Sequence, residues 1–147
     1  MITISNDNEF RIELNKLSVS QQRAVAALFV ENVLSLYEDD RIKRAVKLAE
    51  NPATAEDELQ MAHKMAKAAS VESYTRCGAD GDWRDQAGHF VAKAAATCVA
   101  PGAKENLAWD VAMYCRMART CTNIARDESS ESGENEAQYQ LLSEFVG

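Results

Sequence analysis

The stretch DWRDQAGHFVAKAAATC, residues 82–98, decides the fold of this chain. At about 100° per residue, its apolar and small residues gather on one broad helical face, which holds Trp83, Ala87, Phe90, Val91, Ala94, Ala95 and Cys98. Asp85 and His89 lie four residues apart on the opposite side, which continues as Ala92 and Ala96. The stretch therefore predicts a helix whose second half carries small side chains on nearly all sides. Such a helix suits a central, close-packed position.

Start and stop signals divide the rest of the chain into further helices. Ser18 begins a capping box, Asp39 or Asp40 can cap a short second helix, and Thr54 can start a third. Pro52 ends the second helix, and the glycines after residue 76 end the third. The predicted helices span residues 18–37, 39–50, 54–76, 82–100, 103–126 and 137–146.

The two ends of the chain read differently from its middle. Residues 1–17 alternate at Ile2 and Ile4 and again at Phe10, Ile12 and Leu14, which favours a short hairpin or an irregular arm. Residues 127–136, DESSESGENE, have the composition of a mobile polar linker. The prediction is an all-α, single-domain bundle of four to five main helices, with an N-terminal arm or hairpin and a C-terminal helix.

Length and charge limit the classes of function. A chain of 147 residues fits one domain with a sizeable core. Sixteen basic and 23 acidic residues give a net charge of −7, which argues against binding to nucleic acid or to an anionic membrane and favours a basic protein partner. Because neither a signal peptide nor an apolar run of membrane-spanning length is present, we expect a soluble, cytoplasmic protein.

The cysteines are expected to be reduced thiols of the core. Cys77, Cys98, Cys115 and Cys121 include no C-x-x-C pair, and the closest two are six residues apart, which turns them away from each other on a helix. Free cysteine packs as a small hydrophobic residue.

A metal site in a helical bundle is the sharpest chemical hypothesis, because such sites use Glu-x-x-His pairs on facing helices. Gln60 and Gln86 stand three residues before His63 and His89, so the pair is absent. In an antiparallel hairpin of these two helices, the histidines would miss each other by ~9 Å at ~1.5 Å per residue. We therefore expect neither a metal nor another cofactor.

Catalysis or ligand binding through a histidine is the alternative function. Asp85 and His89 at i and i+4 could form an oriented acid–base pair, although such pairs also occur on ordinary helix surfaces. The sequence holds no nucleophile elbow, phosphate-binding glycine loop or dinucleotide fingerprint. This alternative is a small enzyme or ligand-binding bundle that uses His63 or His89.

Two acidic clusters are candidate partner-binding residues: Glu38, Asp39 and Asp40, and Glu56, Asp57 and Glu58. One interpretation is a shared negative surface that meets a basic partner. The other is that these carboxylates cap helix N-termini and complement the helix dipoles. The two interpretations are compatible.

The helix predicted over 103–126 carries two apolar stripes. Leu107, Val111, Cys115 and Ala118 belong to one stripe; the candidate interface stripe contains Trp109, Met113 and Met117, and Arg116, Arg119 and Asn123 fill a narrow polar arc. Either residues 137–146 cover the interface stripe, or a second copy covers it in a homodimer. Burial within the chain is favoured.

The segments YEDDRIKRAVKLAENPATAEDELQMAHKMAKAAS, AGHFVAKAAATC and ENLAWDVAMYCRMA give residues 24–121 a distinctive order. This order resembles the alanine-rich, all-helical immunity proteins associated with bacterial polymorphic toxins. The resemblance implies a helical bundle that neutralises a toxin by binding it, with no catalytic residue to transfer. A non-catalytic binding protein is thus the leading hypothesis, and an oligomeric structural protein is a third.

Overall fold

The computed structural model describes residues 3–80, 83–102, 106–125 and 133–147, with 76–80 as backbone only. Seven α-helices and one short 3₁₀ helix form the regular structure of these residues, and no strand occurs among them. In chain order they are α1 (Asp7–Asn15), α2 (Val19–Glu31), η1 (Leu34–Leu36), α3 (Asp40–Glu50), α4 (Glu56–Asp80), α5 (Trp83–Cys98), α6 (Leu107–Ala125) and α7 (Glu134–Val146). The all-α prediction is confirmed, with more helices than the four to five main ones expected.

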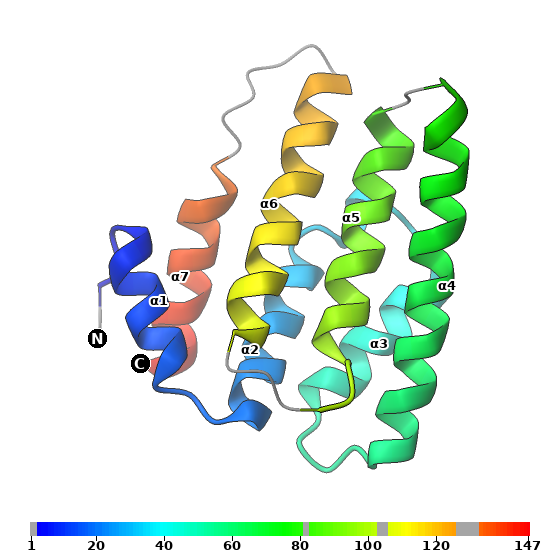
Figure 1. Ribbon diagram of the computed structural model, residues 1–147. Coiled ribbons are helices and arrows are strands. Elements are labelled where there is room, and N and C mark those ends of the chain that lie inside the picture. The colour runs from blue at the N-terminus through cyan, green and yellow to red at the C-terminus, as the bar shows by residue number, and fades with distance from the viewer. Residues whose placement is uncertain (1–2, 81–82, 103–105, 126–132) are drawn as a thin grey trace.

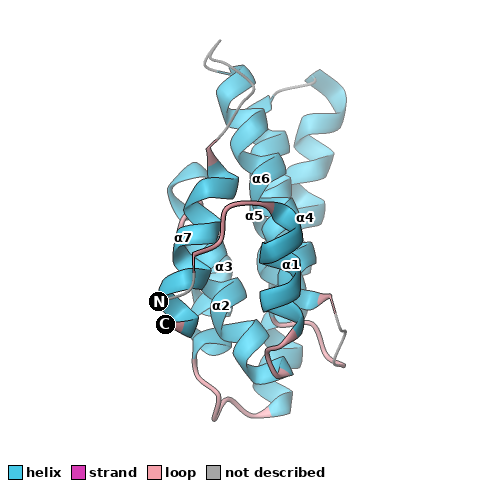
Figure 2. Ribbon diagram, turned by 90° about the vertical axis from the view of Figure 1, so that its left-hand side faces the viewer, coloured by secondary structure: helices cyan, strands magenta, loops and turns pink. Residues whose placement is uncertain are grey.

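The helices form one bundle with α5 at its centre. Figure 1 shows α4, α5 and α6 side by side in a row, with α2 and α3 behind them. The view in Figure 2 shows α1 and α7 at the edge of the bundle, beside α6 and α2. The helices thus enclose a single hydrophobic core, which extends from Ile4 to Leu142.

The central position predicted for the alanine-rich stretch is confirmed. α5 packs most extensively on α4 and α6 and also touches α2 and α3. The buried residues of α5 have small side chains and lie on more than one side of the helix: Ala87, Gly88, Val91, Ala92, Ala94, Ala95, Ala96 and Cys98. Trp83 departs from the prediction, since this side chain at the start of the helix is 41% exposed.

Gly88 allows a close approach of neighbouring elements to α5. A Cβ atom at this position would lie 2.6 Å from Cδ1 of Tyr37 and 2.9 Å from Oγ of Ser73. Tyr37 follows η1, and Ser73 belongs to α4, so two elements converge on the bare backbone of one residue. No larger residue fits there without displacing a neighbour.

Several local signals act as predicted. Ser18 and Gln21 form the complete capping box of α2, and the Asp39 side chain caps α3 by accepting a hydrogen bond from the backbone N–H of Arg41. α3 ends at Glu50, next to Asn51 and Pro52. The C-terminus of α5 is capped by a distant side chain, because the guanidinium of Arg23 donates to the carbonyls of Cys98 and Ala100.

The hairpin or irregular arm expected at the N-terminus is wrong, because residues 7–15 form α1. Asn6 caps this helix by accepting from the N–H of Glu9, and Phe10 and Leu14 are fully buried one turn apart. Ile12, which completed the alternating pattern, is 49% exposed. A helical period of four residues therefore describes the burial, and the period of two does not.

Other predicted boundaries also shift. The helix expected over 18–37 is divided into α2 and η1, and α4 starts at Glu56 because Thr54 instead donates a hydrogen bond to the carbonyl of Leu48. α4 continues past residue 76 to Asp80. Residues 134–136 of the expected linker form the first turn of α7, and 127–132 lie outside the described residues.

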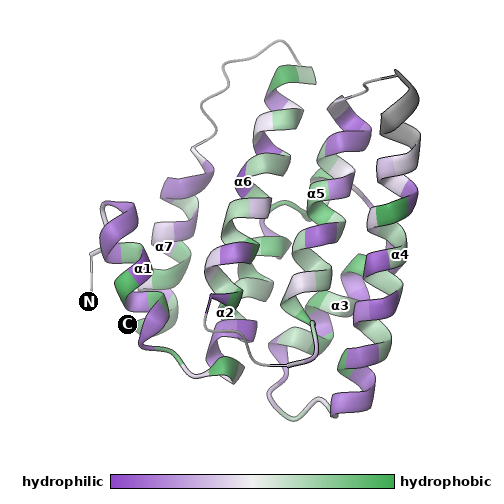
Figure 3. Cartoon of the chain, in the orientation of Figure 1, coloured by the Kyte–Doolittle hydropathy of each residue, from purple (hydrophilic) through white to green (hydrophobic). Residues whose placement is uncertain are grey.

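Hydrophilic and hydrophobic residues are mixed along the helices (Figure 3). Within the described part of the chain, none of the helices is both long and apolar enough to cross a membrane.

Candidate functional site

The three residues of the candidate polar site lie along the α4–α5 interface. Nδ1 of His63 on α4 bonds the carbonyl of Ala96 at 2.8 Å, and Nδ1 of His89 on α5 is 3.0 Å from both Oγ and the carbonyl oxygen of Ser70. These bonds fix an antiparallel register in which the two histidines lie seven residues apart, about 10 Å at ~1.5 Å per residue. The prediction that they do not share one ion agrees with this register.

His89 contacts two aromatic rings. The rings of Tyr74 and Phe90 lie 5.2 and 5.3 Å from the imidazole, and the Asp85 backbone carbonyl accepts from Ser73 one turn earlier. These contacts describe a half-buried histidine that joins two helices. Among the described residues, no group of three metal-binding side chains is close enough to hold an ion.

His63 lines a small cavity at the other end of the same interface. The cavity measures about 190 Å³, and Thr97, Asp110 and Tyr114 also line it. Because Nδ1 of His63 bonds the carbonyl of Ala96, Nε2 is the ring nitrogen that this bond does not use. The cavity thus offers a ring nitrogen, a carboxylate and two hydroxyls to a small ligand.

The two acidic clusters do not form one surface. Arg41, in the first turn of α3, pairs with Asp39 and with Glu72 of α4, each at 2.7 Å. Glu72 lies about 24 Å along α4 from Glu56 at ~1.5 Å per residue, so the clusters stand at opposite ends of α3. The hydrogen bonds that Arg41 donates, first to Asp39 and then to Glu72, raise the pKa of its guanidinium.

Within these clusters, the carboxylates differ in what they contact. Asp39 is half-buried and serves the capping role, whereas Glu38 and Asp40 are exposed. The second cluster, Glu56, Asp57 and Glu58, is fully on the surface in the first turn of α4. The capping interpretation therefore applies to Asp39, and binding of a basic partner by the exposed carboxylates stays a prediction.

In the candidate interface stripe, only Trp109 has contacts with α1, and the predicted cover of the whole stripe by the C-terminal helix is not seen, since Met117 is exposed. Trp109 is half-buried beneath α1, where Phe10 lies 6.1 Å from its ring and the Arg11 guanidinium 4.8 Å above it. Met113 is half-buried and Met117 is 47% exposed. The homodimer through this stripe stays a prediction.

α7 docks instead on the arc that the sequence marks as polar. Gln138 is fully buried, and its side-chain amide donates to the carbonyl of Ala112 and accepts from Nε of Arg116. The same guanidinium pairs with Asp7 of α1 at 2.9 Å, and Asp7 also accepts from the hydroxyl of Tyr139. The hydrogen bond from Arg116 is the main reason that the pKa of Asp7 lies below its usual range.

A second polar contact holds the start of α7. Glu134 is 2% exposed, and its carboxylate accepts from Arg119 on α6 and from Asn32 after α2. Apolar burial and buried hydrogen bonds therefore both attach the terminal helix. No local sequence pattern indicates these contacts, because the partners lie far apart in the chain.

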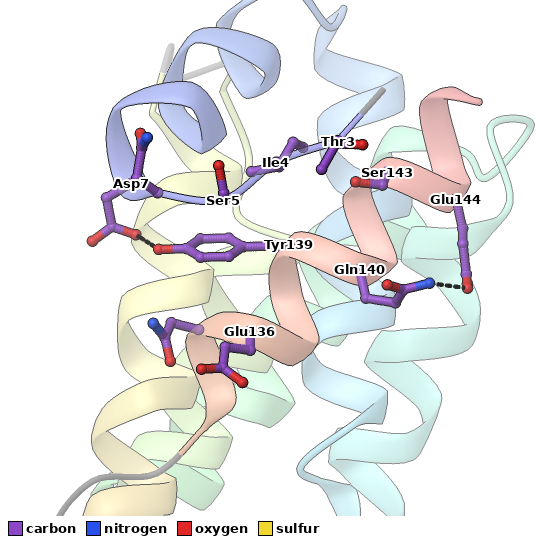
Figure 4. A pocket seen from close by; sticks show the side chains of 11 residues that line it. Thr3, Ile4, Ser5, Asp7, Glu136, Tyr139, Gln140, Ser143 and Glu144 are labelled. Atoms are coloured by element: carbon purple, nitrogen blue, oxygen red, sulfur yellow. Dashed lines mark hydrogen bonds between the residues drawn. The ribbon is translucent and has the colours of Figure 1, made fainter. Parts of the chain in front are cut away.

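An open cavity of about 560 Å³ lies between residues 3–7 and α7 (Figure 4). From α7 it is lined by Glu136, Tyr139, Gln140, Ser143 and Glu144. None of these residues was predicted as a site residue. A signal was present, because positions 136, 140 and 144 repeat every four residues and so form one polar stripe on a helix.

Comparison of the chain with protein-family models, with curated proteins and with solved structures gives no match. The fold and its sites define an all-α bundle with a central alanine-rich helix and an open polar cavity beside its C-terminal helix.

Proposed function

We propose that this protein acts by binding another protein, and that the outer face of α4 makes the contact. Four of the eight large apolar side chains that are exposed in the described part of the chain belong to this helix: Met61 (57%), Met65 (42%), Val71 (56%) and Tyr74 (61%). α4 stands at the edge of the row in Figure 1 and packs chiefly on α3 and α5, so its outer side is uncovered. This concentration of exposed apolar surface is the observation that carries the proposal.

The acidic first turn of the same helix favours a basic partner at that end of α4, beyond which Lys64 and Lys67 are exposed. Glu56, Asp57 and Glu58 are exposed at its start, and Met61 follows one turn after them. The chain as a whole has a net charge of −7, so a positively charged protein is attracted over distance and guided to this face. Flexible methionine side chains then adapt to the surface that they meet.

Neutralisation of a toxin is the particular role that we propose. An immunity protein needs a stable scaffold and a binding surface, and it needs no catalytic group. The resemblance of residues 24–121 to the immunity proteins of polymorphic toxins supports this role, as does the acidic first turn of α4, which suits a basic toxin.

Ligand binding at His63 is the second candidate function. The cavity of about 190 Å³ beside His63 favours it, since Asp110, Tyr114 and Thr97 bring several hydrogen-bonding groups to one place.

Co-expression tests the leading proposal. The product of the gene adjacent to that of this chain is expressed with wild-type protein, with Met61→Arg, or with Ile12→Arg as a control on exposed α1 surface. We expect the wild type and the control to restore growth and to bind the toxin equally. Met61→Arg should bind at least about ten-fold more weakly, as expected for a residue that contributes strongly to an interface.

A neighbouring product that is not toxic, or equal binding by both variants, would contradict the proposal. Sedimentation of the free protein tests the structural alternative. If Met61→Arg dissociates an oligomer of this chain, α4 is a self-association surface.

A further inference from the structure

We propose that the cavity beside His63 binds a guanidinium group, which belongs either to a small free compound or to an arginine side chain. This inference rests on ligand binding at His63, the second function proposed above, and names the chemistry of the ligand. Three features support it: polar groups that converge from three helices, a lining that offers mainly hydrogen-bond acceptors, and the small size of the cavity.

The polar groups of the cavity come from three helices that stand side by side in Figure 1. His63 belongs to α4, Thr97 to α5, and Asp110 and Tyr114 to α6. Asp110 and Tyr114 are four residues apart, so they lie one turn apart on the same face of their helix. The site is thus assembled by the packing of α4 and α6 against α5.

Asp110 supplies the charge. It is half-buried, and its carboxylate forms no hydrogen bond or ion pair within the described part of the chain. Because no buried side-chain oxygen or nitrogen of the described residues lacks a partner, this carboxylate is accessible, and Asp110 lines the cavity. Lys93 lies over the ring of Tyr114, but it is exposed and does not line the cavity. A partly desolvated carboxylate without a partner favours a cationic ligand.

The remaining polar groups favour a ligand with several donors. The Thr97 hydroxyl donates its proton to the carbonyl of Lys93 at 2.9 Å, so it can only accept from a ligand. Nδ1 of His63 bonds the carbonyl of Ala96, which leaves Nε2 for the cavity. The Tyr114 hydroxyl can donate or accept. A ligand that satisfies the carboxylate and the Thr97 oxygen together must supply donors in more than one direction.

The size and the apolar part of the lining favour a guanidinium over an ammonium group. At about 190 Å³ the cavity is smaller than the ~300–1,000 Å³ of ordinary small-molecule sites, so it suits a single functional group. Ala100 and Leu107 line it beside the polar groups. A guanidinium is planar, weakly hydrated and has about five N–H donors in a fixed arrangement, whereas an ammonium is a compact, strongly hydrated charge. The planar cation therefore loses less hydration in this cavity and reaches more acceptors.

NMR titration of the ¹⁵N-labelled full chain with methylguanidine tests this assignment. Methylammonium and acetate are the comparison ligands. We expect methylguanidine to shift the backbone amide signals of Thr97, Asp110 and Tyr114 to saturation, and to bind at least about five-fold more tightly than methylammonium. Acetate should leave these signals unchanged.

N-acetyl-arginine-N-methylamide distinguishes the two sources of the guanidinium group. If it binds more tightly than methylguanidine, the group belongs to an arginine side chain of a polypeptide. If it binds more weakly, the group belongs to a small free compound.

Substitutions in the lining test the roles of the single groups. Asp110→Asn should weaken methylguanidine binding at least about five-fold, and Tyr114→Phe about three-fold. Glu136→Gln is the matched control, because it removes an exposed carboxylate from the first turn of α7, as Asp110→Asn removes one from the first turn of α6. Glu136 lies outside this cavity, so its substitution should leave the affinity unchanged within about two-fold.

The negative results differ in meaning. If methylammonium or acetate binds at these residues as tightly as methylguanidine, the cavity binds ligands but the guanidinium assignment is wrong. If none of the probes shifts these signals, both the assignment and ligand binding at His63 are wrong. Equal weakening by Glu136→Gln and Asp110→Asn would show general attraction of a cation and would also overturn the assignment. If Asp110→Asn unfolds the protein, the order of the probes on the wild type and the effect of Tyr114→Phe decide the question.

Discussion

Replacing Gly88 with alanine tests how closely the helices approach α5. The new methyl group would stand 2.6 Å from Cδ1 of Tyr37 and 2.9 Å from Oγ of Ser73. Ordinary contacts between carbon atoms are about 3.5–4.0 Å, so the Tyr37 ring must withdraw by about 1 Å. Ser73 has little freedom to yield, because its hydroxyl donates to the Asp85 carbonyl at 2.6 Å.

Two opposing effects set the magnitude. Overpacking of a close contact costs about 1–3 kcal/mol, whereas alanine is favoured over glycine inside a helix by about 1 kcal/mol. The steric cost should be in the upper part of its range, because both a ring and a hydrogen-bonded hydroxyl are displaced. We therefore expect Gly88→Ala to lower the free energy of unfolding by about 1–2 kcal/mol, and the melting temperature by about 3–6 °C.

Urea unfolding of four proteins measures this effect: the wild type, Gly88→Ala, Tyr37→Ala and the double variant. Removing the ring relieves part of the clash, so Gly88→Ala should cost less in the Tyr37→Ala background. If the single substitution Gly88→Ala instead stabilises the protein by about 1 kcal/mol, the predicted clash with Tyr37 and Ser73 does not occur. That result would mean that helix propensity alone acts at this position and that Tyr37 is not packed on Gly88.

Three further predictions concern buried or paired groups. Gln138→Leu leaves the Nε of Arg116 without its acceptor and should lower the free energy of unfolding by about 1–3 kcal/mol, measured by urea unfolding; an unchanged midpoint would contradict the docking of α7. Asp7 has a lowered pKa in the folded protein, so it contributes stability above its ordinary pKa of 3.8 that is lost as the pH falls through the lowered value. The stability difference between the wild type and Asp7→Asn, less than about 1 kcal/mol for this half-exposed pair, should disappear between about pH 5 and pH 2; a difference independent of pH would show that the charge is not involved. Burial raises the pKa of Cys98 to about 12 and that of Cys115 well above its usual value, so site-resolved mass spectrometry should find both unalkylated by iodoacetamide in the native protein and modified in urea, and rapid native labelling would contradict their burial.

The central part of the fold could be predicted because its signals are local. The stretch 82–98 contains its own helical period, and its small residues on nearly all sides indicate burial without reference to any other element. The capping box at Ser18 and the cap at Asp39 likewise depend on residues within three positions. Local signals of this kind act in the same way whichever elements pack around them.

The N-terminal helix could not be predicted with the same certainty, because its pattern fits two periods. Phe10, Ile12 and Leu14 alternate as in a strand, while Phe10 and Leu14 alone are spaced as in a helix. The choice depends on contacts with distant residues: Phe10 packs on Phe29 and Tyr139 at 5.7 and 5.4 Å. Tertiary packing decides between periods that a short segment leaves equal.

The polar sites could not be predicted, because they are formed by residues that are far apart in the sequence. The sequence pattern places Arg116 and Arg119 on the polar arc of α6, where exposure to solvent is expected. In the structure they are partly buried, because carboxylates of α1 and α7 pair with them. The cavity beside Ser143 forms only when residues 3–7 meet a helix near the other end of the chain. A spacing pattern within one helix could show the polar stripe at 136, 140 and 144 but not the wall opposite it.

The small side chains of α5 have a consequence for how the protein opens. Alanine and glycine lose no rotamer freedom on burial, so α5 enters the core at a low cost in side-chain entropy and lets its neighbours lie against its backbone. α7 is attached partly through hydrogen-bonded side chains that water can replace. Amide hydrogens of α5 should therefore exchange with solvent only when the whole bundle unfolds, whereas those of α7 exchange earlier, through local detachment of that helix.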